Sequence, residues 1–297
     1  MKTTVINTES TRVKDKLRDY SQLIKFRLTF TVVLSAVFGY LIGYSGALNW
    51  SELIALVIGG ILVVSSSNGL NQIVEKNFDV LMTRTENRPL AQNRMSVVEA
   101  GFFCSITGVI GVYVLGQYLN QYAALLGFLS LVSYAFVYTP LKRVSSIAVF
   151  IGAFPGAIPP LLGWVAATGQ FSADAGILFL IQFVWQFPHF WAIAWILDDD
   201  YKKAGYRLLP FKKGRTKTSA LLIIFISALL IPISLTPFFI GMSGIISLLI
   251  ITLSSIALTF LSVRLYKTLS LKNAKTLMFA SIIYNPLVLI TLWIDKI

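Results

Sequence analysis

Residues 52–74 read ELIALVIGGILVVSSSNGLNQIV, a run of 23 residues in which Glu52 is the only charged side chain. A helix needs about 20 mainly apolar residues to cross the ~30 Å hydrocarbon core of a bilayer. Similar apolar runs recur from residue 28 almost to the C-terminus. Because the backbone finds no water in that layer, it must satisfy its own hydrogen bonds, and helices in a bundle do so. The sequence therefore predicts an all-α, polytopic membrane protein.

The composition agrees with this class. Of the 297 residues, 56% are hydrophobic and only 13% are charged, whereas soluble domains carry about 25% charged residues. Cys104 is the only cysteine, so no intramolecular disulfide can form. Residues 1–25 mix acidic and basic side chains without an apolar core, unlike a secretory signal or an acid-poor transit peptide. We interpret them as a cytoplasmic N-terminal arm lying at the membrane interface, and residues 26–297 as a single transmembrane domain.

Length and helix breakers predict nine spans in that domain. They are residues 28–48, 52–74, 97–118, 121–138, 147–167, 173–197, 218–240, 243–265 and 274–294. With the N-terminus placed in the cytoplasm, 24 of the 25 Lys and Arg residues fall on the cytoplasmic side, and only Lys296 lies opposite. The positive-inside rule favours this orientation, in the cell (inner) membrane. The net charge of +12 then reflects topology and anionic lipid, and no nucleic-acid partner is needed to explain it.

The first long cytoplasmic loop, 75–96, is rich in acids and arginines. Asn71, Glu75 and Asp79 are spaced four residues apart, so they form one stripe if the second helix continues through them. Oxygen ligands on one helix face suit Mg²⁺, which is usually held by one or two carboxylates together with substrate phosphates. Arg84 and Arg88 follow, and a guanidinium matches phosphate oxygens. The pattern indicates a diphosphate site, and the alternative is a solvated loop of ion pairs.

The second long loop, 198–217, begins with Asp198, Asp199 and Asp200. Consecutive residues of a helix cannot all face one way, so at most two of these carboxylates are expected to face a cavity. An acidic, solvated helix end is the alternative. Four spans separate the two long loops, so both emerge on the same side and are expected to meet.

Three further features are less specific. His189, the only histidine, is either a hydrogen-bonded core residue or a contact for a large ligand entering from the bilayer. Lys142 and Arg143 lie on the same side as the two loops and are either membrane anchors or anion ligands. The Pro- and Gly-rich stretch 152–164, GAFPGAIPPLLGW, predicts a broken helix lining a cavity, and Pro188 predicts a kink.

Together these residues resemble a known family. Asn71, Glu75 and Asp79 are similar to the NDxxDxxxD signature of the UbiA superfamily of intramembrane prenyltransferases, with Gln72 in place of its second-position Asp. Residues 152–164 and two further stretches resemble the haem O synthase (protohaem IX farnesyltransferase) branch of that superfamily. The further stretches are DVLMTRTENRPL at 79–90 and WQFPHFWAIAWILDDDYKKAGYRLLP at 185–210. The resemblance covers roughly residues 20 to 290.

The resemblance implies nine helices around a central cavity and Mg²⁺-dependent transfer of a farnesyl group from farnesyl diphosphate to a vinyl group of haem B. It also implies haem A synthase as a downstream partner. Asn71, Glu75 and Asp79 would hold Mg²⁺ and diphosphate. The diphosphate charge would be stabilised by Arg84, Arg88, Lys142 and Arg143, and the second wall, near the porphyrin, would carry His189, Asp199, Asp200 and Tyr201.

One departure limits this comparison. The superfamily often has a DxxxD second motif, but Lys202, Lys203 and Ala204 stand four residues beyond the three aspartates. A second metal held in the usual way is therefore in doubt. Two other functions compete with the haem reaction: prenylation of an aromatic quinone precursor, and secondary transport of an anionic metabolite. The transporter alternative expects ionisable residues within the spans, where the sequence has almost none.

Overall fold

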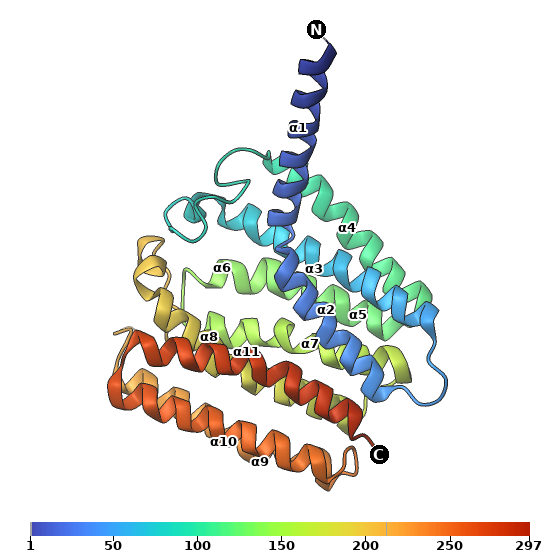
Figure 1. Cartoon of the computed structure of the whole chain (residues 1–297), viewed down its shortest axis with the longest axis vertical. Helices are drawn as coiled ribbons and strands as arrows, with labels where there is room; N and C mark the ends of the chain where they lie inside the picture. The colour runs from blue at the N-terminus through green and yellow to red at the C-terminus, as the bar shows by residue number, and fades with distance from the viewer. Residues whose placement is uncertain (1, 212) are drawn as a thin grey trace.

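The protein is a helical bundle. The computed structural model describes residues 2–211 and 213–297, with side chains from Val13 onward apart from residue 212 (Figure 1). Residue 1 of the predicted arm and residue 212 of the second loop lie outside the described residues. In chain order the elements are α1 (Lys2–Leu23), α2 (Phe26–Gly43), α3 (Trp50–Asp79), α4 (Val97–Tyr118), α5 (Gln121–Val132), the π-helix η1 (Ser133–Tyr138), α6 (Thr139–Leu141), α7 (Ala148–Thr168), α8 (Ala173–Lys203), α9 (Lys217–Phe239), α10 (Ile245–Thr268) and α11 (Leu271–Ile294).

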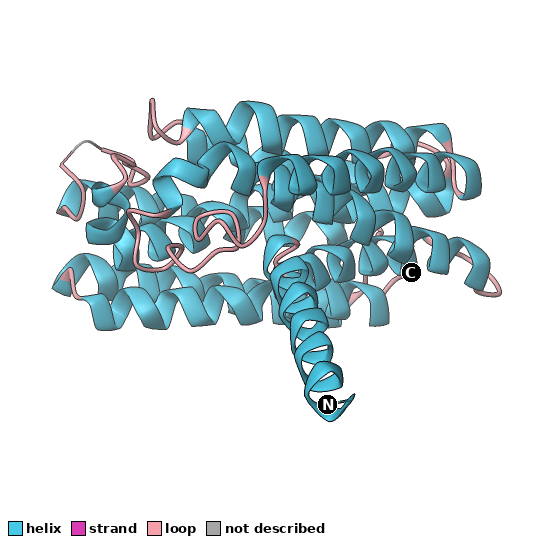
Figure 2. Cartoon of the chain, turned by 90° about the horizontal axis from the view of Figure 1, so that it is seen from above, coloured by secondary structure: helices cyan, strands magenta, loops and turns pink. Residues whose placement is uncertain are grey.

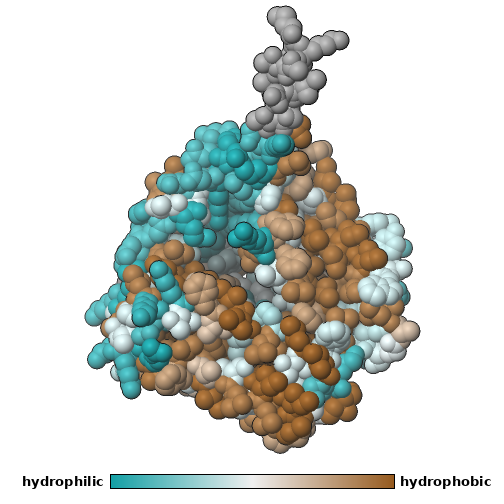
Figure 3. Space-filling view, viewed as in Figure 1, coloured by the Kyte–Doolittle hydropathy of each residue, from teal (hydrophilic) through white to brown (hydrophobic). Residues whose placement is uncertain are grey.

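Nine helical segments of the described chain are long and apolar enough to cross a membrane, counting α5, η1 and α6 as one. Large apolar side chains, such as Phe102, Val109 and Phe260, cover the outside of the bundle, and Figure 3 shows this hydrophobic surface. An exposed apolar surface of this extent suits lipid and not water. Figure 3 also shows a hollow near the middle of this face, bordered on one side by hydrophilic residues. The prediction of an all-α bundle with nine spans is confirmed.

Local sequence explains where many spans begin. Each of six helices starts at an Asn, Ser or Thr whose side chain accepts a hydrogen bond from a backbone N–H of the first turn, which satisfies a group that the helix itself leaves free. These residues are Asn49, Ser96, Asn120, Ser172, Thr216 and Ser270.

The predicted break in the fifth span is wrong. Helix α7 is continuous from Ala148 to Thr168 although it contains Pro155, Pro159 and Pro160. A proline within a helix leaves the carbonyl four residues earlier without its N–H partner. The Ser130 hydroxyl donates to the Pro155 carbonyl at 3.3 Å, which is the carbonyl that Pro159 leaves free. Neighbouring helices thus supply partners that keep α7 intact. Helix α8 is also continuous through Pro188, and the kink expected there stays a prediction.

Glycines bring α2 and α7 into backbone contact. A Cβ atom at Gly39 would overlap the carbonyl of Pro160, and one at Gly163 would overlap the carbonyl of Ala36. Small residues at such positions let two membrane helices approach closely and gain packing energy. The contact fixes α2, and with it the start of that helix, against the middle of the bundle.

Helix α1 projects from the bundle across the direction of the spans (Figures 1 and 2). Its last turns are attached to the bundle by two ion pairs, Lys16 with Glu99 at 2.8 Å and Arg94 with Asp19 at 2.9 Å. The predicted arm is therefore a helix whose end is fixed on α4 and the first long loop. Its place at a membrane interface stays a prediction.

The polar connections between spans meet at one end of the bundle. The Asp200 carboxylate on α8 accepts hydrogen bonds from the backbone N–H groups of Thr83 and Arg84 in the first long loop, at 2.9 and 3.2 Å. Lys296 lies with the α2–α3 connection, where its ammonium donates to the carbonyls of Leu41 and Tyr44. The expectation that the two long loops meet is confirmed. That this end faces the cytoplasm stays a prediction.

Candidate active site

The centre of the polar end is one face of α3. Asn71, Glu75 and Asp79 all lie within this helix, which is unbroken through Asp79. Their exposed fractions are only 1%, 4% and 0%. Carboxylates are almost never so buried unless they are paired, and a buried amide needs hydrogen-bond partners. The three side chains therefore form an enclosed stripe, whereas a solvated loop would expose them.

Each member of the stripe has its own basic partner from a different part of the chain. A lysine of the α1–α2 turn, a lysine that follows α6 and an arginine of the first long loop converge on α3. The pairs are Lys25 Nζ with Asn71 Oδ1 at 2.7 Å, Lys142 Nζ with Glu75 Oε1 at 2.6 Å, and Arg88 Nη1 with Asp79 Oδ2 at 2.7 Å.

Further bonds join the pairs into one cluster. Arg88 also lies 3.6 Å from Glu75, and the Tyr206 hydroxyl of the second long loop donates to the same carboxylate at 3.3 Å. The Asn71 amide donates to the hydroxyl of Thr139 at 3.1 Å. Burial, and then the charge of Glu75, hold the pKa of Tyr206 above its ordinary value, so this tyrosine stays a proton donor.

Aromatic faces lie against three of the basic groups, within the ~6 Å at which a cation is attracted to a ring. Of these rings, Tyr138 belongs to the second half of the fourth span and Tyr201 to the end of α8. The contacts are Arg143 over Phe78 at 3.9 Å, Lys142 over Tyr138 at 4.6 Å, and Arg84 over Tyr201 at 5.8 Å, each to the ring centroid.

The three consecutive aspartates point three ways, as the helix geometry predicts. Asp200 faces the first long loop through its bonds to the backbone and accepts from Lys203 at 3.0 Å. Asp198 is buried and pairs with Lys202 at 2.6 Å. Asp199 is 75% exposed at its side chain and pairs with Arg215 at 2.9 Å. The structure thus brings Asp200 to the site and leaves Asp199 outside it.

His189 lies apart from the stripe, on the part of α8 that packs against α11. Its Nδ1 is 2.8 Å from the Ser281 hydroxyl, and its ring stacks on Trp185 with centroids 5.0 Å apart. The Trp185 indole donates to the Ser281 carbonyl at 2.8 Å. The histidine therefore has the hydrogen-bonded surroundings of a core residue.

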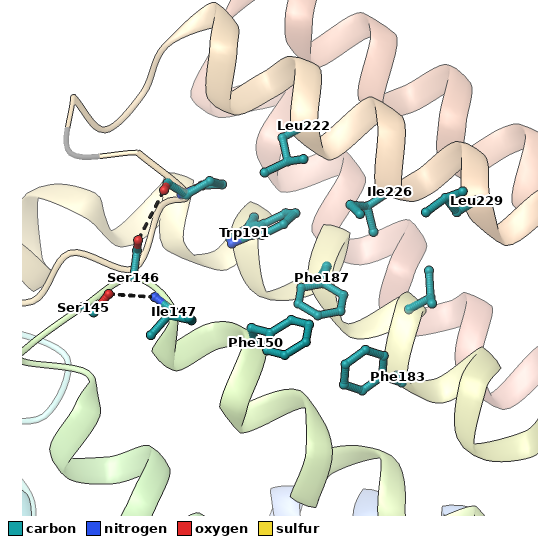
Figure 4. A pocket seen from close by; sticks show the side chains of 12 residues that line it. Ser145, Ser146, Ile147, Phe150, Phe183, Phe187, Trp191, Leu222, Ile226 and Leu229 are labelled. Carbon is teal, nitrogen blue, oxygen red and sulfur yellow. Dashed lines mark hydrogen bonds between the residues drawn. The ribbon is translucent and has the colours of Figure 1, made fainter. Parts of the chain in front are cut away.

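A separate apolar cavity of about 630 Å³ lies among α7, α8 and α9. Figure 4 shows Phe150, Phe183, Phe187 and Trp191 along one side and Leu222, Ile226 and Leu229 along the other, with Ser145 and Ser146 at one end. None of the polar residues predicted from the sequence lines it. Its surface suits an apolar chain, whereas the charged cluster suits an anion.

Sequence reasoning missed two members of the cluster. Lys25 lies in the segment predicted to be an interfacial arm, and Tyr206 does not stand out from its neighbours in the second loop. The sequence holds one signal for each: Lys25 lies three residues before the first apolar run, and Tyr206 lies within the stretch that resembles the haem O synthase branch. Neither signal indicates that the side chain points into the cluster.

The donor set fits a divalent cation only in part. Asn71, Glu75 and Asp79 offer one amide and two carboxylate oxygens on one face, which suits Mg²⁺ when substrate phosphates supply further ligands. Within residues 13–211 and 213–297, no three His, Cys, Asp or Glu side chains gather in a way that could hold a metal by themselves. The stripe is therefore suited to a metal that arrives with an anionic substrate, not to a resident structural ion.

Comparison with known proteins agrees with this chemistry. The sequence pattern of the UbiA prenyltransferase family matches residues 32–283. The chain belongs to the UbiA prenyltransferase family. It is a multi-pass membrane enzyme, and its relatives place it in the bacterial inner membrane. Two of those relatives are the protoheme IX farnesyltransferases of Cytophaga hutchinsonii, 47% identical over 94% of this chain and 97% of that protein, and of Christiangramia forsetii, 45% identical over 94% of each.

Solved structures share the UbiA fold. A digeranylgeranylglyceryl phosphate synthase superposes with a TM-score of 0.79 at 22% identity, covering 95% of this chain and 98% of the other. A UbiA homologue from Archaeoglobus fulgidus, bound to GPP and Mg²⁺, superposes with a TM-score of 0.69 at 16% identity, covering 92% of this chain and 99% of the other. At these identities the likeness establishes the fold.

Proposed function

We propose that this enzyme transfers the farnesyl group of farnesyl diphosphate to a vinyl group of haem B, giving haem O. Binding of the diphosphate is supported by one observation: Asn71, Glu75 and Asp79 are each paired with a basic side chain. The identity of the acceptor rests on the farnesyltransferases that are 43–47% identical to this chain. Haem A synthase is the proposed consumer of the product.

Mg²⁺ would be held by Asn71, Glu75 and Asp79 with the diphosphate, and when bound it would neutralise charge on the leaving group. Arg88 and Lys142, which now pair with the two carboxylates, are placed to stabilise the diphosphate as it departs. The exposed Arg84 and Arg143 lie at the rim of the same cluster. Preorganised charges of this kind lower a barrier because they need no rearrangement during the reaction.

The bond between C1 of the farnesyl group and the diphosphate oxygen breaks, and the electron pair leaves with the diphosphate. The allylic cation then forms a bond with the terminal vinyl carbon of haem B, and water adds to the neighbouring carbon with loss of a proton. Rings of Tyr138, Tyr201 and Phe78 lie beside the basic groups, where they can face a carbocation and exclude water from it.

The second wall is proposed to contact the porphyrin through His189 and Tyr201. His189 offers a polar ring within the bundle, next to Trp185. Asp200 acts at a distance from the reacting atoms, by joining α8 to the first long loop. Asp199 faces away, so we leave it out of the proposed catalytic set.

The test uses purified protein in nanodiscs, supplied with haem B, farnesyl diphosphate and Mg²⁺, with the pigment analysed by mass. We expect a product heavier than haem B by one farnesyl group and one hydroxyl group, and no product when EDTA is present. Unchanged haem from folded protein that still binds diphosphate would reject haem as the acceptor. Release of diphosphate with an aromatic acceptor would then indicate the quinone-precursor reaction.

A further inference from the structure

The α1–α2 turn carries a lysine in an unusual backbone conformation. Lys25 has φ 51° and ψ 57°, in the left-handed region, where a residue with a Cβ atom loses about 1–2 kcal/mol. Its ammonium reaches inward to Asn71 Oδ1 at 2.7 Å. Such strain persists only where the surroundings hold the backbone in place.

Two amides of α3 hold that turn. Gln72 Nε2 donates to the carbonyls of Gln22 and Leu23 at 2.9 and 2.8 Å, and Asn68 Nδ2 donates to the carbonyl of Ile24 at 3.1 Å. Both amide side chains are buried, with exposed fractions of 0% for Gln72 and 2% for Asn68. They satisfy carbonyls that the end of α1 leaves without helical partners. Gln72, the residue that departs from the family signature, therefore points to the turn and away from the stripe.

The cluster that Lys25 joins has more positive than negative charge. Lys25, Arg88 and Lys142 bind the stripe, in which only Glu75 and Asp79 carry a negative charge, and the exposed Arg84 and Arg143 lie at the rim. A buried excess of positive charge is costly without an anion.

We infer that Lys25 is a direct ligand of the diphosphate, and that Gln72 and Asn68 are positioning residues that present it. The inference rests on the proposed prenyl diphosphate site. On binding of substrate, the Lys25 ammonium moves from Asn71 Oδ1 to a diphosphate oxygen, which releases the amide oxygen. The same exchange applies to the pairs Lys142–Glu75 and Arg88–Asp79. Each basic side chain therefore occupies one oxygen of the stripe until the anion binds.

The experiment measures the affinity of the full-length protein in nanodiscs for inorganic diphosphate with excess Mg²⁺, by calorimetry, so that turnover is not needed. Lys25→Met, Gln72→Met and the double variant are compared with wild type. Arg27→Met is the matched control, because Arg27 is a basic residue two positions away and is exposed. We expect Lys25→Met to weaken binding about 10-fold or more, as for loss of a charge-assisted hydrogen bond, and Arg27→Met to bind as wild type.

The double variant separates positioning from mere structure. If Gln72 acts through Lys25, adding Gln72→Met to Lys25→Met will weaken binding no further. Independent losses would overturn the positioning role of Gln72. Wild-type affinity in Lys25→Met, with an unchanged melting temperature, would overturn the inference while the diphosphate site stands.

Two further outcomes are distinguishable. A wild-type protein that binds no diphosphate would overturn the site itself, and the role of Lys25 with it. If Gln72→Met does not fold, Asn68→Ala, which removes the bond to the Ile24 carbonyl and adds no charge, is measured in its place, and it is expected to weaken diphosphate binding only while Lys25 is present.

Discussion

Lys142 Nζ lies 2.6 Å from Glu75 Oε1, and both residues are buried. The pair joins the end of the fourth span to the middle of the stripe on α3. A buried ion pair is favourable only when both charges are present. Loss of either residue should therefore affect both the stability of the protein and the site.

Lys142→Met is expected to destabilise the protein. It leaves the Glu75 carboxylate buried with only Arg88 at 3.6 Å and the Tyr206 hydroxyl as partners. Removal of one partner of a buried pair costs about 3 kcal/mol. Unfolding in detergent measures this loss. The double variant Lys142→Met, Glu75→Gln should recover part of the stability, and a double variant as unstable as the sum of the two single variants would contradict the pairing.

Asp79→Asn is expected to lower kcat by a factor on the order of 10² to 10³, as for removal of one preorganised electrostatic group. The side chain is fully buried and accepts both of its short bonds from Arg88, and an amide keeps its shape. Farnesyl transfer at saturating substrates checks the prediction. Asp15→Asn, in the exposed ion pair with Arg18, is the control, and an equal effect on both variants would argue against the stripe.

Asp200→Asn and Asp199→Asn are expected to differ although the residues are neighbours. Asp200 holds the backbone of Thr83 and Arg84, so its loss should loosen the first long loop and raise KM for farnesyl diphosphate several-fold. Asp199 is exposed on the far side of α8 and should change KM much less. Steady-state kinetics of the two variants decides the matter, and equal changes in KM would reject the proposed tie between the loops.

Gly39→Ala is expected to destabilise the protein, whereas Gly101→Ala is expected to stabilise it. A methyl group at Gly39 meets the backbone of Pro160 in α7, whereas one at Gly101 meets no atom within 4 Å. Gly101→Ala should stabilise its helix by about 0.5–1 kcal/mol, because alanine favours a helix over glycine. Gly39→Ala should lower the melting temperature and the yield of folded protein. A stable Gly39→Ala protein would mean that α2 and α7 can move apart freely.

The spans, the stripe on α3 and the meeting of the two long loops could be predicted because each depends on a strong local rule. Apolar length marks a span, and four-residue spacing places Asn71, Glu75 and Asp79 on one face. The direction of each of the three aspartates near the end of α8 could not be predicted, since it depends on which neighbours approach. Lys25 is inward only because Gln72 and Asn68 hold its turn, and such long-range contacts leave no periodic trace.

In the proline-rich fifth span, by contrast, a strong local rule gives the wrong prediction. Three prolines predict a break from local sequence, but Ser130 of another helix supplies a donor to a freed carbonyl. Propensity rules describe a helix alone, and in a bundle the neighbours provide hydrogen bonds that the sequence of the span does not reveal.

The glycine contact between α2 and α7 also bears on the order in which the chain is synthesised. Helix α2 is the first span to leave the ribosome, yet the backbone that it packs against, around Pro160 and Gly163, belongs to the fifth. Until α7 is inserted, α2 lacks this support, and the turn that carries Lys25 has no fixed depth relative to α7. The second long loop is made only after α8, so the two halves of the site become adjacent late in biogenesis. In a chain arrested before α7, the acidic stripe of α3 should therefore already lie in the membrane. Lys142, the basic partner that follows α6, would not yet be followed by the helix that packs on α2.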